Sequence, residues 1–343
     1  MRYRFRRLDA VVLKGKGIQA MDVEQELPNL TRRQALKATG AASLGLIAPG
    51  GGPLHGRAHP HADRSRGLSC RRERAVEADA QGGPEPLVQA GITQSVARWC
   101  FAAIPLPEFC TAVGEIGLRA MDLLTVDEWA VAYDHGLVVS CGDVGAGTIE
   151  DGLNEPRNHP AIIAAFEEHI PRAAREGVPN VICFFGNRRG MSDGPAIENS
   201  VRCLRECAPI AEAEGVTILV EVLNSKPGGH VDYIGDRMPY ALEVMRAVNS
   251  ARVRILYDIY HMQIMEGDII RTLTDSAGWI GHYHTGGVPG RAEIDETQEL
   301  CYPAIVRAIR DTGFAGYMAH EFIPRSGDPL GSLAQAVEMC EGA

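Results

Sequence analysis

Several features that mark other classes of protein are scarce or missing in this chain of 343 residues, and each absence narrows the possible functions. Basic residues are in the minority, because 34 Lys and Arg face 44 Asp and Glu for a net charge of −10. A protein that binds nucleic acid needs a basic surface, so we expect no nucleic acid partner. No stretch approaches the roughly 18 consecutive apolar residues of a membrane-spanning helix, so we expect no membrane span.

Cysteine is present, but not in a pattern that indicates a disulfide framework. The nine cysteines are odd in number and include no CxxC pair. Cys203 and Cys207 fall on one face of a predicted helix, where a role as small core residues explains them best. A hydrophobic content of 45% is typical of a soluble protein and is sufficient for a sizeable core.

The first ninety residues differ in composition from the rest of the chain. Residues 31–37, reading TRRQALK, resemble a twin-arginine export motif, and an apolar stretch follows at 38–47. We therefore predict a twin-arginine signal region over residues 1–48, of which 1–20 is an over-extended gene start, and export to the periplasm or the exterior. The alternative is a chance pair of arginines, which would leave the protein in the cytoplasm. Residues 49–91, rich in Gly, Pro, His and Arg, are predicted to form a disordered linker.

From residue 92 onward, apolar strand segments alternate regularly with helical segments. The predicted strands are residues 95–101, 120–124, 137–141, 180–185, 217–224, 254–260, 280–285 and 317–322. Eight strand–helix units in about 250 residues are typical of a (β/α)₈ barrel. A doubly wound open sheet is the alternative, but no GxGxxG follows the first strand to support dinucleotide binding. We predict a single α/β domain, a (β/α)₈ TIM barrel, over residues 92–343.

Four ionisable residues lie at or near the C-terminal ends of consecutive predicted strands: Glu221, Asp258, His284 and Glu321. A lone buried carboxylate costs several kcal/mol unless a cation compensates it. Active sites of these barrels form at the C-terminal ends of the strands, and neighbouring strands lie about 4.8 Å apart, so the four side chains can converge. Solvation at a strand end explains any one of them, but it does not explain four in succession. Three carboxylates and one imidazole predict a site for one divalent ion such as Mn²⁺, Mg²⁺ or Co²⁺.

The two glutamates in this set suggest a reaction as well as a metal site. Moving a proton between adjacent carbons beside a carbonyl requires removal of a weakly acidic C–H and stabilisation of an enediolate. A divalent ion stabilises the developing charge as a Lewis acid. One carboxylate can abstract the proton while the other returns it from the opposite side. Glu221 and Glu321, from strands five and eight, provide such a pair.

Four loop motifs carry a resemblance to a known family. They are GAGTIEDGLN at 145–154, GNRRGMSD at 186–193, YDIYHMQ at 257–263 and VPGR at 288–291. Together they resemble the hydroxypyruvate isomerases, which belong to the xylose-isomerase-like barrels, over roughly residues 94–339.

The resemblance implies that Glu221, Asp258, His284 and Glu321 bind the metal and that the two glutamates are the catalytic acid/base pair. The isomerases carry Gln where this chain has His284, and histidine there is more similar to the ketose 3-epimerases of the same superfamily. The predicted function is therefore interconversion of hydroxypyruvate and tartronate semialdehyde, or of a similar small 2-keto compound. The alternatives are a ketose 3-epimerase or aldose–ketose isomerase and, less favoured, a secreted sugar-binding barrel without catalysis. The expected partner is a small keto acid or sugar, and assembly into a homo-oligomer is left open.

Further polar residues near the predicted barrel mouth are candidates for binding the substrate. His261 follows Asp258 by three residues and is expected to hydrogen-bond a substrate hydroxyl. Arg291, in a Pro-Gly turn, is expected to grip a carboxylate or hydroxyl with two N–H groups, and Arg188 lies in a Gly-flanked loop at the same mouth. His282 and His320 are excluded from the site, on the expectation that strand alternation points both away from the metal.

Overall fold

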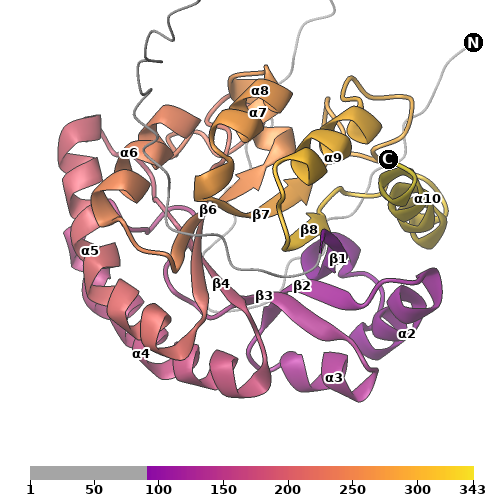
Figure 1. The fold of residues 1–343 in the computed structure, drawn as a ribbon, viewed down its shortest axis with the longest axis horizontal. Coiled ribbons are helices and arrows are strands. Elements are labelled where there is room, and N and C mark those ends of the chain that lie inside the picture. The colour runs from indigo at the N-terminus through magenta and orange to yellow at the C-terminus, as the bar shows by residue number, and fades with distance from the viewer. Residues whose placement is uncertain (1–90) are drawn as a thin grey trace, which may run out of the picture. The chain divides into compact units, whose positions relative to one another are not determined.

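Eight parallel strands close into a barrel in the order in which they occur along the chain, and β8 pairs with β1 to complete the ring (Figure 1). The structure is a computed structural model in which residues 91–343 are described. The predicted signal region 1–48 and all but the last residue of the predicted linker 49–91 lie outside the described residues. The predicted (β/α)₈ barrel is confirmed.

The strands are short and mostly buried. They are β1 (Thr93–Ala97), β2 (Ala120–Thr125), β3 (Val138–Asp143), β4 (Asn180–Phe184), β5 (Thr217–Glu221), β6 (Val253–Asp258), β7 (Ile280–Thr285) and β8 (Tyr317–His320). Five of them end earlier than predicted, β4 by one residue and β8 by two. The first predicted strand continues as a short 3₁₀ helix, η1 (Arg98–Phe101), the fifth stops at Glu221, and the sixth turns directly into a helix after Asp258. The early ends of β5 and β6 bring the carboxylates of Glu221 and Asp258 to the rim of the barrel.

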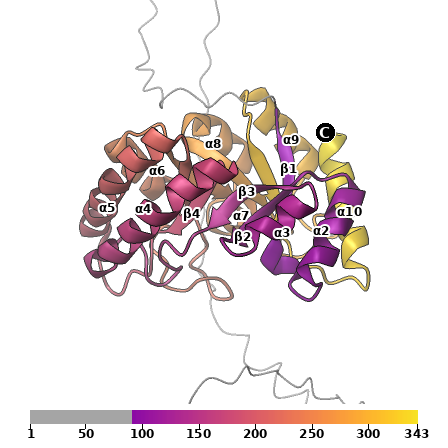
Figure 2. The same ribbon diagram turned by 90° about the horizontal axis from the view of Figure 1, so that it is seen from below.

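Helices surround the barrel on the outside, as Figures 1 and 2 show. They are α2 (Leu106–Ile116), α3 (Trp129–Asp134), α4 (His159–Glu176), α5 (Asp193–Glu214), α6 (Met238–Val248), α7 (Ile259–Met265), α8 (Ile269–Asp275), α9 (Tyr302–Asp311) and α10 (Pro329–Glu341), with the 3₁₀ turns η2 (Pro156–Asn158) and η3 (Ala277–Trp279) between them. The sequence marks many of their ends. Proline stands in the first turn of α4, α6, α9 and α10, where its missing N–H costs nothing. Left-handed Gly117, Gly177 and Gly215 end α2, α4 and α5.

Alternation along the buried strands divides the core into two layers. The larger layer fills the space between the strands and the helices, and it includes Val139, Val181 and Val220. The smaller layer fills the barrel interior with Cys141, Ile182, Leu219 and Leu256. Because side chains alternate, the strand residues two positions beyond Leu219 and Leu256 also face the interior, at its C-terminal end.

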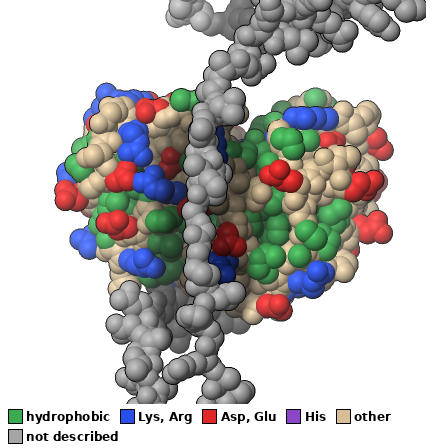
Figure 3. Space-filling model, turned by 90° about the horizontal axis from the view of Figure 1, so that it is seen from above, with side chains coloured by type: hydrophobic (Ala, Val, Ile, Leu, Met, Phe, Trp, Pro, Cys, Tyr) green, Lys and Arg blue, Asp and Glu red, His purple; other side chains and the backbone are tan. Residues whose placement is uncertain are grey.

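The described surface carries charges of both signs. On the face that Figure 3 shows, the Lys and Arg side chains lie among Asp, Glu and apolar side chains and do not join into one continuous basic surface. This distribution agrees with the excess of acidic over basic residues in the chain. Among residues 91–343, no helix has both the length and the apolar character needed to cross a membrane.

Candidate active site and metal cluster

The four predicted metal ligands meet at the C-terminal end of the barrel interior. Glu221 and Asp258 are the last residues of β5 and β6, His284 lies in β7, and Glu321 directly follows β8. Each offers one ligand atom, and these atoms all lie within 4.8 Å of one another. All four side chains are buried, with at most 4% of any residue exposed.

The imidazole of His284 contacts both glutamates through one ring nitrogen. Its Nδ1 atom is 3.1 Å from Oε1 of Glu221 and 2.6 Å from Oε2 of Glu321. Asp258 completes the group from the neighbouring strand, because Asp258 and His284 are directly paired in the β6–β7 register. The Asp258 side chain also caps the N-terminus of α7 by accepting a hydrogen bond of 2.9 Å from the backbone N–H of His261. The cap fixes the carboxylate at the end of its strand.

Burial is the largest single influence on these groups; it sets the direction of the net pKa shift for Glu221 and Asp258, whereas neighbouring charges reverse that direction for Glu321 and His284. Burial, reinforced by the negative charge of Glu321, raises the pKa of Glu221. Burial also raises the pKa of Asp258 to about 7, against the opposing effect of Arg291. For Glu321 burial acts in the same direction, but Arg291 and His284 outweigh it and hold the pKa well below its usual range. Burial alone would lower the pKa of His284, yet the surrounding carboxylates hold it well above its usual value.

The positively charged guanidinium of Arg291 lies beside the cluster. Its Nη2 donates to Oδ2 of Asp258 at 3.0 Å and also to Glu321. The guanidinium lies between the rings of Trp99 and Tyr260, 5.3 Å from each ring centroid. Metal binding requires the carboxylates to be ionised and the imidazole to be neutral, and in that state the three carboxylates and the guanidinium carry a net charge of −2, which a divalent ion would neutralise. Arg291 therefore lies at the candidate site, in contact with two of the four candidate ligands.

Trp99 is a site residue that the sequence reasoning missed. Its indole Nε1 donates to Oε1 of Glu321 at 2.6 Å. It lies in η1, which the sequence pattern predicts as the end of the first strand, so its side chain is easily taken for part of the core. The signal that could have found it is an aromatic residue just beyond the C-terminal end of a barrel strand.

His261 and Arg188 do not occupy the positions expected of substrate-binding residues. His261 is 1% exposed and lies behind Arg291, whose Nη1 is 2.7 Å from its Nε2. The backbone N–H of Asn224 donates to its other ring nitrogen at 3.1 Å. Arg188 donates to Oδ1 of Asp193 at 2.6 Å, at the beginning of α5. Neither residue lines the cavity above the cluster. In this structure His261 contacts the guanidinium of Arg291, and Arg188 forms an ion pair with Asp193.

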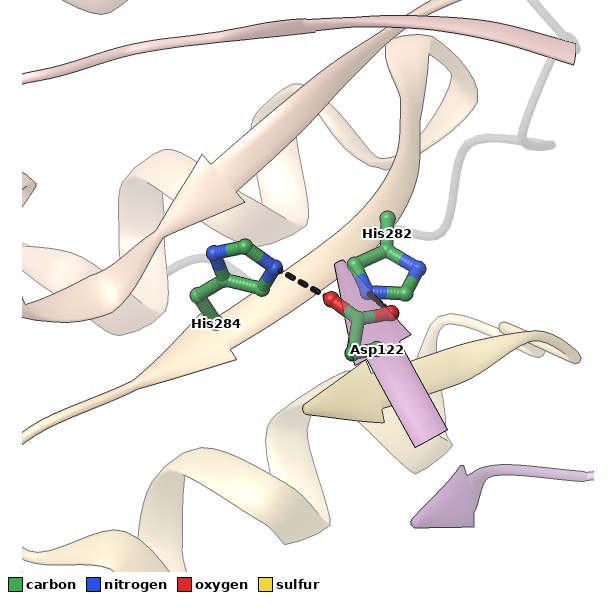
Figure 4. A group of neighbouring side chains, drawn as sticks. All are labelled: Asp122, His282 and His284. Carbon is green, nitrogen blue, oxygen red and sulfur yellow. Dashed lines mark hydrogen bonds and ion pairs between the residues drawn. The ribbon is translucent and has the colours of Figure 1, made fainter. Parts of the chain in front are cut away.

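The expectation that strand alternation points His282 away from the metal ligands was wrong, whereas His320 does point away from them. His282 and His284 are two residues apart and therefore share a face, and both point into the barrel interior (Figure 4). Between them lies Asp122 of β2, which the sequence reasoning overlooked although it interrupts the apolar run AMDLL. His320 faces away from the cluster, within 2.9 Å of the side chain of Gln94 and 3.1 Å of that of Thr285.

A cavity of about 580 Å³ opens above the cluster. Glu221, Glu321 and Arg291 contribute to its lining, so the two glutamates are accessible from the space in which a substrate would lie. Apolar side chains, including Trp99 and Phe184, form part of the remaining wall. A second cavity, of about 390 Å³, lies at the opposite end of the barrel and contacts none of the candidate ligands. The first cavity therefore belongs to the candidate site.

Comparison with known proteins agrees with this arrangement. Residues 116–342, well over half of the chain, match the family model described as xylose isomerase-like TIM barrel. The chain belongs to this family.

Proteins of several names are similar to the chain, to different extents. A 2-oxo-tetronate isomerase of Cupriavidus necator is 34% identical over 146 residues, which cover 40% of this chain and 54% of that protein. A human protein named putative hydroxypyruvate isomerase is 26% identical over 252 residues, covering 69% of this chain and 90% of that protein. The crystal structure of D-psicose 3-epimerase with D-tagatose from Clostridium cellulolyticum H10 has a TM-score of 0.55 at 20% identity, covering 74% of this chain and 92% of the other. This last likeness concerns the fold alone.

Proposed function

We infer that this chain is a metal-dependent isomerase that moves a proton between adjacent carbons of hydroxypyruvate or a similar small 2-keto compound. The observation that carries the proposal is the pair of glutamates, Glu221 and Glu321, which both contact Nδ1 of the His284 imidazole and line one cavity. The isomerase names of relatives that match this chain support the same class of reaction. A barrel that only binds sugar needs no such pair of bases.

The donor set fits a divalent ion. Three carboxylates and one imidazole nitrogen within 4.8 Å of one another are the oxygen-rich set that Mn²⁺, Mg²⁺ or Co²⁺ prefers. Nε2 of His284 is 3.0 Å from Asp122, which leaves Nδ1 directed at the carboxylates as a ligand atom. When bound, the metal would act as a Lewis acid that stabilises negative charge on the substrate oxygens. The ligands would be Glu221, Asp258, His284 and Glu321.

The surroundings of the two glutamates assign them different parts of the proton transfer. The raised pKa of Glu221 makes its carboxylate the stronger base, suited to remove the proton from carbon. Trp99 and Arg291 donate hydrogen bonds to Glu321 and, with His284, lower its pKa, so its protonated form gives up a proton readily. Arg291 also lines the cavity, where it can hold a substrate carboxylate or hydroxyl. Apolar wall residues such as Phe184 would limit the access of water.

A ketose 3-epimerase is the second candidate, and two observations favour it. The ligand at position 284 is histidine, and the cavity of about 580 Å³ lies within the range that accommodates drug-sized ligands. A sugar of five or six carbons would fill more of that space than a three-carbon acid. The same pair of glutamates would serve, because epimerisation also removes a proton beside a carbonyl and returns one from the opposite side.

The decisive experiment combines metal analysis of the full chain with a panel of substrates in deuterated water. We expect one divalent ion per chain and exchange of the substrate C–H proton of hydroxypyruvate, detected by NMR. Exchange on free ketoses but not on hydroxypyruvate would establish the epimerase instead. A metal-loaded protein that exchanges no proton on either class, while the sugars still bind, would support the non-catalytic barrel and reject both enzymes.

A further inference from the structure

A buried carboxylate lies directly behind the only histidine among the four candidate metal ligands. Asp122 of β2 and His284 of β7 are both 0% exposed, and Oδ2 of Asp122 is 3.0 Å from Nε2 of His284. Figure 4 shows the carboxylate between the two imidazoles, with the contact to His284 drawn as a dashed line. At the opposite edge of the His284 ring, Nδ1 contacts Glu221 and Glu321. His284 is thus held from both of its nitrogens.

The two nitrogens of a neutral imidazole are not equivalent, because one carries a hydrogen and the other a lone pair. An ionised carboxylate only accepts hydrogen bonds, so Asp122 requires the hydrogen of His284 to be on Nε2. The lone pair is then on Nδ1, which points at the three carboxylates. We propose that Asp122 is a positioning residue that selects this tautomer and fixes the ring of His284 for metal binding. This inference rests on the proposal that the cluster holds a metal ion.

The environment of Asp122 suits it to this role. The hydroxyl of Ser140 donates a hydrogen bond to its Oδ1, and Nε2 of His282 lies 3.3 Å from the same oxygen. A carboxylate held by Ser140 and His282 in the buried interior is itself positioned to orient the ring of His284. Partners that orient a metal-binding histidine typically contribute 10–100-fold to metal affinity.

Two other roles for the same three residues are open to test. Asp122, His282 and His284 could themselves hold a second metal ion, since their ligand atoms also lie within 4.8 Å of one another. Nδ1 of His282 has no hydrogen-bond partner among the described residues, which leaves a ring nitrogen for such an ion. Alternatively, Asp122 could be no more than a part of the interior packing. The three roles differ in metal stoichiometry, in the response to an apolar replacement and in the tautomer of His284.

The first test measures Mn²⁺ affinity by competition titration on the full chain and its variants. Asp122→Leu keeps roughly the volume and removes the acceptor, and it should weaken binding roughly 10–100-fold. Asp122→Asn retains a carbonyl oxygen that can accept from Nε2–H, so it should lose less affinity than the Leu variant but bind more weakly than the native protein. Cys141→Ala, a change to another buried residue of the barrel interior, is the matched control and should leave the affinity unchanged.

The second test detects the tautomer itself by long-range ¹H–¹⁵N NMR of protein loaded with diamagnetic Zn²⁺. The native protein should show the His284 hydrogen on Nε2 in a hydrogen bond, which Asp122→Leu should lose and Asp122→Asn should weaken. This readout would not change if Asp122 served packing alone. If the Leu variant does not fold, the Asn variant decides the question by the same two measurements.

Several results would overturn the inference. Native Mn²⁺ affinity in both Asp122 variants, or a hydrogen on Nδ1 of His284 in the native metal-loaded protein, would do so. Two ions per native chain that fall to one in Asp122→Leu would assign the three residues to a second metal site instead. A native chain that binds no Mn²⁺ would reject the metal-dependent function itself, and with it this role. Only in that last case would the proposed function and the inference fail together.

Discussion

At the scale of single residues, the site depends on carboxylates that are chemically alike but placed in different surroundings. The side chain of Glu221 contacts the imidazole of His284, whereas that of Glu321 is contacted by Trp99, Arg291 and His284. The pKa of the first is raised and that of the second is lowered. Such a separation of two carboxylates is characteristic of acid and base roles in one site. Two predictions concern these individual side chains.

The first prediction tests whether the glutamates transfer protons. Glu221→Gln and Glu321→Gln keep the size and one coordinating oxygen, so metal should remain bound in part. Loss of the proton acceptor should lower turnover by about 10²–10⁴-fold in each variant. Proton–deuterium exchange by NMR in metal-saturated protein measures the step directly. In a two-base mechanism, one variant exchanges the proton of one substrate and the other that of its isomer. Turnover near the native rate in both would leave the glutamates as ligands only.

The second prediction concerns pH and the metal-free protein. Asp258 has a pKa of about 7 in the folded state against an ordinary 3.8, so between these values the folded state keeps a proton that the unfolded state has released. Its contribution to stability is therefore fully present below about pH 4 and is lost as the pH rises through 7. Metal binding displaces the same proton, so metal affinity should increase with pH up to about 7.

Urea unfolding of EDTA-treated protein between pH 4.5 and 7.5 measures this dependence, and Asp258→Asn is its control because the amide does not titrate. The native protein should lose more stability over this window than the variant does. If the free energy of unfolding changed with pH equally in the two proteins, Asp258 would not be protonated in the metal-free fold.

At the scale of elements, the loop after β3 is tied to the end of β4. The backbone N–H groups of Leu153 and Asn154 donate to the carbonyls of Phe184 and Phe185 at 3.0 and 2.9 Å. Gly152 makes this approach possible, because a Cβ there would meet the carbonyl oxygen of Phe184 and lie 2.5 Å from the backbone nitrogen of Gly186. The glycine in the GAGTIEDGLN motif thus permits close packing of two backbones at the barrel mouth.

The third prediction compares two glycines in different settings. Gly152→Ala should destabilise the protein by about 1–3 kcal/mol, since backbone atoms must shift to admit the methyl group. Gly114→Ala, within α2, should stabilise it by roughly 0.4–1 kcal/mol, because a Cβ added there would meet no atom within 4 Å. Chemical unfolding of both variants gives the two values. Equal effects at the two positions would show that the loop accommodates a side chain without strain.

At the scale of the whole molecule, metal binding and barrel closure are linked, because the four candidate ligands come from β5, β6, β7 and the residue after β8. An unfolded chain cannot bring these segments together, so an ion that binds only the folded state stabilises all of it. At a free-ion concentration 100 times Kd, that stabilisation is about 2.7 kcal/mol.

The fourth prediction is that Mn²⁺ or Mg²⁺ raises Tm by roughly 5–10 °C, from about 2–4 °C per kcal/mol for a domain of this size. Asp258→Ala should abolish both the bound metal and the rise in Tm, whereas Arg188→Gln, outside the cavity, should retain both. Differential scanning calorimetry with and without EDTA gives the shift. Full metal occupancy in Asp258→Ala would contradict the ligand set.

The fifth prediction concerns the amino-terminal region, which lies outside the described residues. We propose that residues 31–37 direct export by the twin-arginine route. Changing Arg32 and Arg33 to Lys should therefore retain the protein in the cytoplasm of a native host while isomerase activity of the purified protein is unchanged. Fractionation followed by immunoblotting measures the distribution, and unimpaired export of the double variant would rule out this route.

The sequence by itself determined the barrel and its four candidate ligands. Alternating strand and helix segments, with proline at helix starts and glycine at helix ends, are local signals that do not depend on distant contacts. Glu221, Asp258, His284 and Glu321 were visible because each places an ionisable group at the end of an apolar strand. In a closed parallel barrel all such ends lie on one face, so the topology alone brings them together.

Only the tertiary structure decided which other side chains reach this cluster. Asp122 and His284 are 162 residues apart and meet across the barrel interior, which requires the ring to close in one register. Trp99 contacts Glu321 only because β1 ends early and lies beside β8. His261 and Arg188 carry the right chemistry but are held by Arg291 and Asp193 instead. Contacts of this kind depend on strand register, loop path and competition between partners, none of which is encoded in a local pattern.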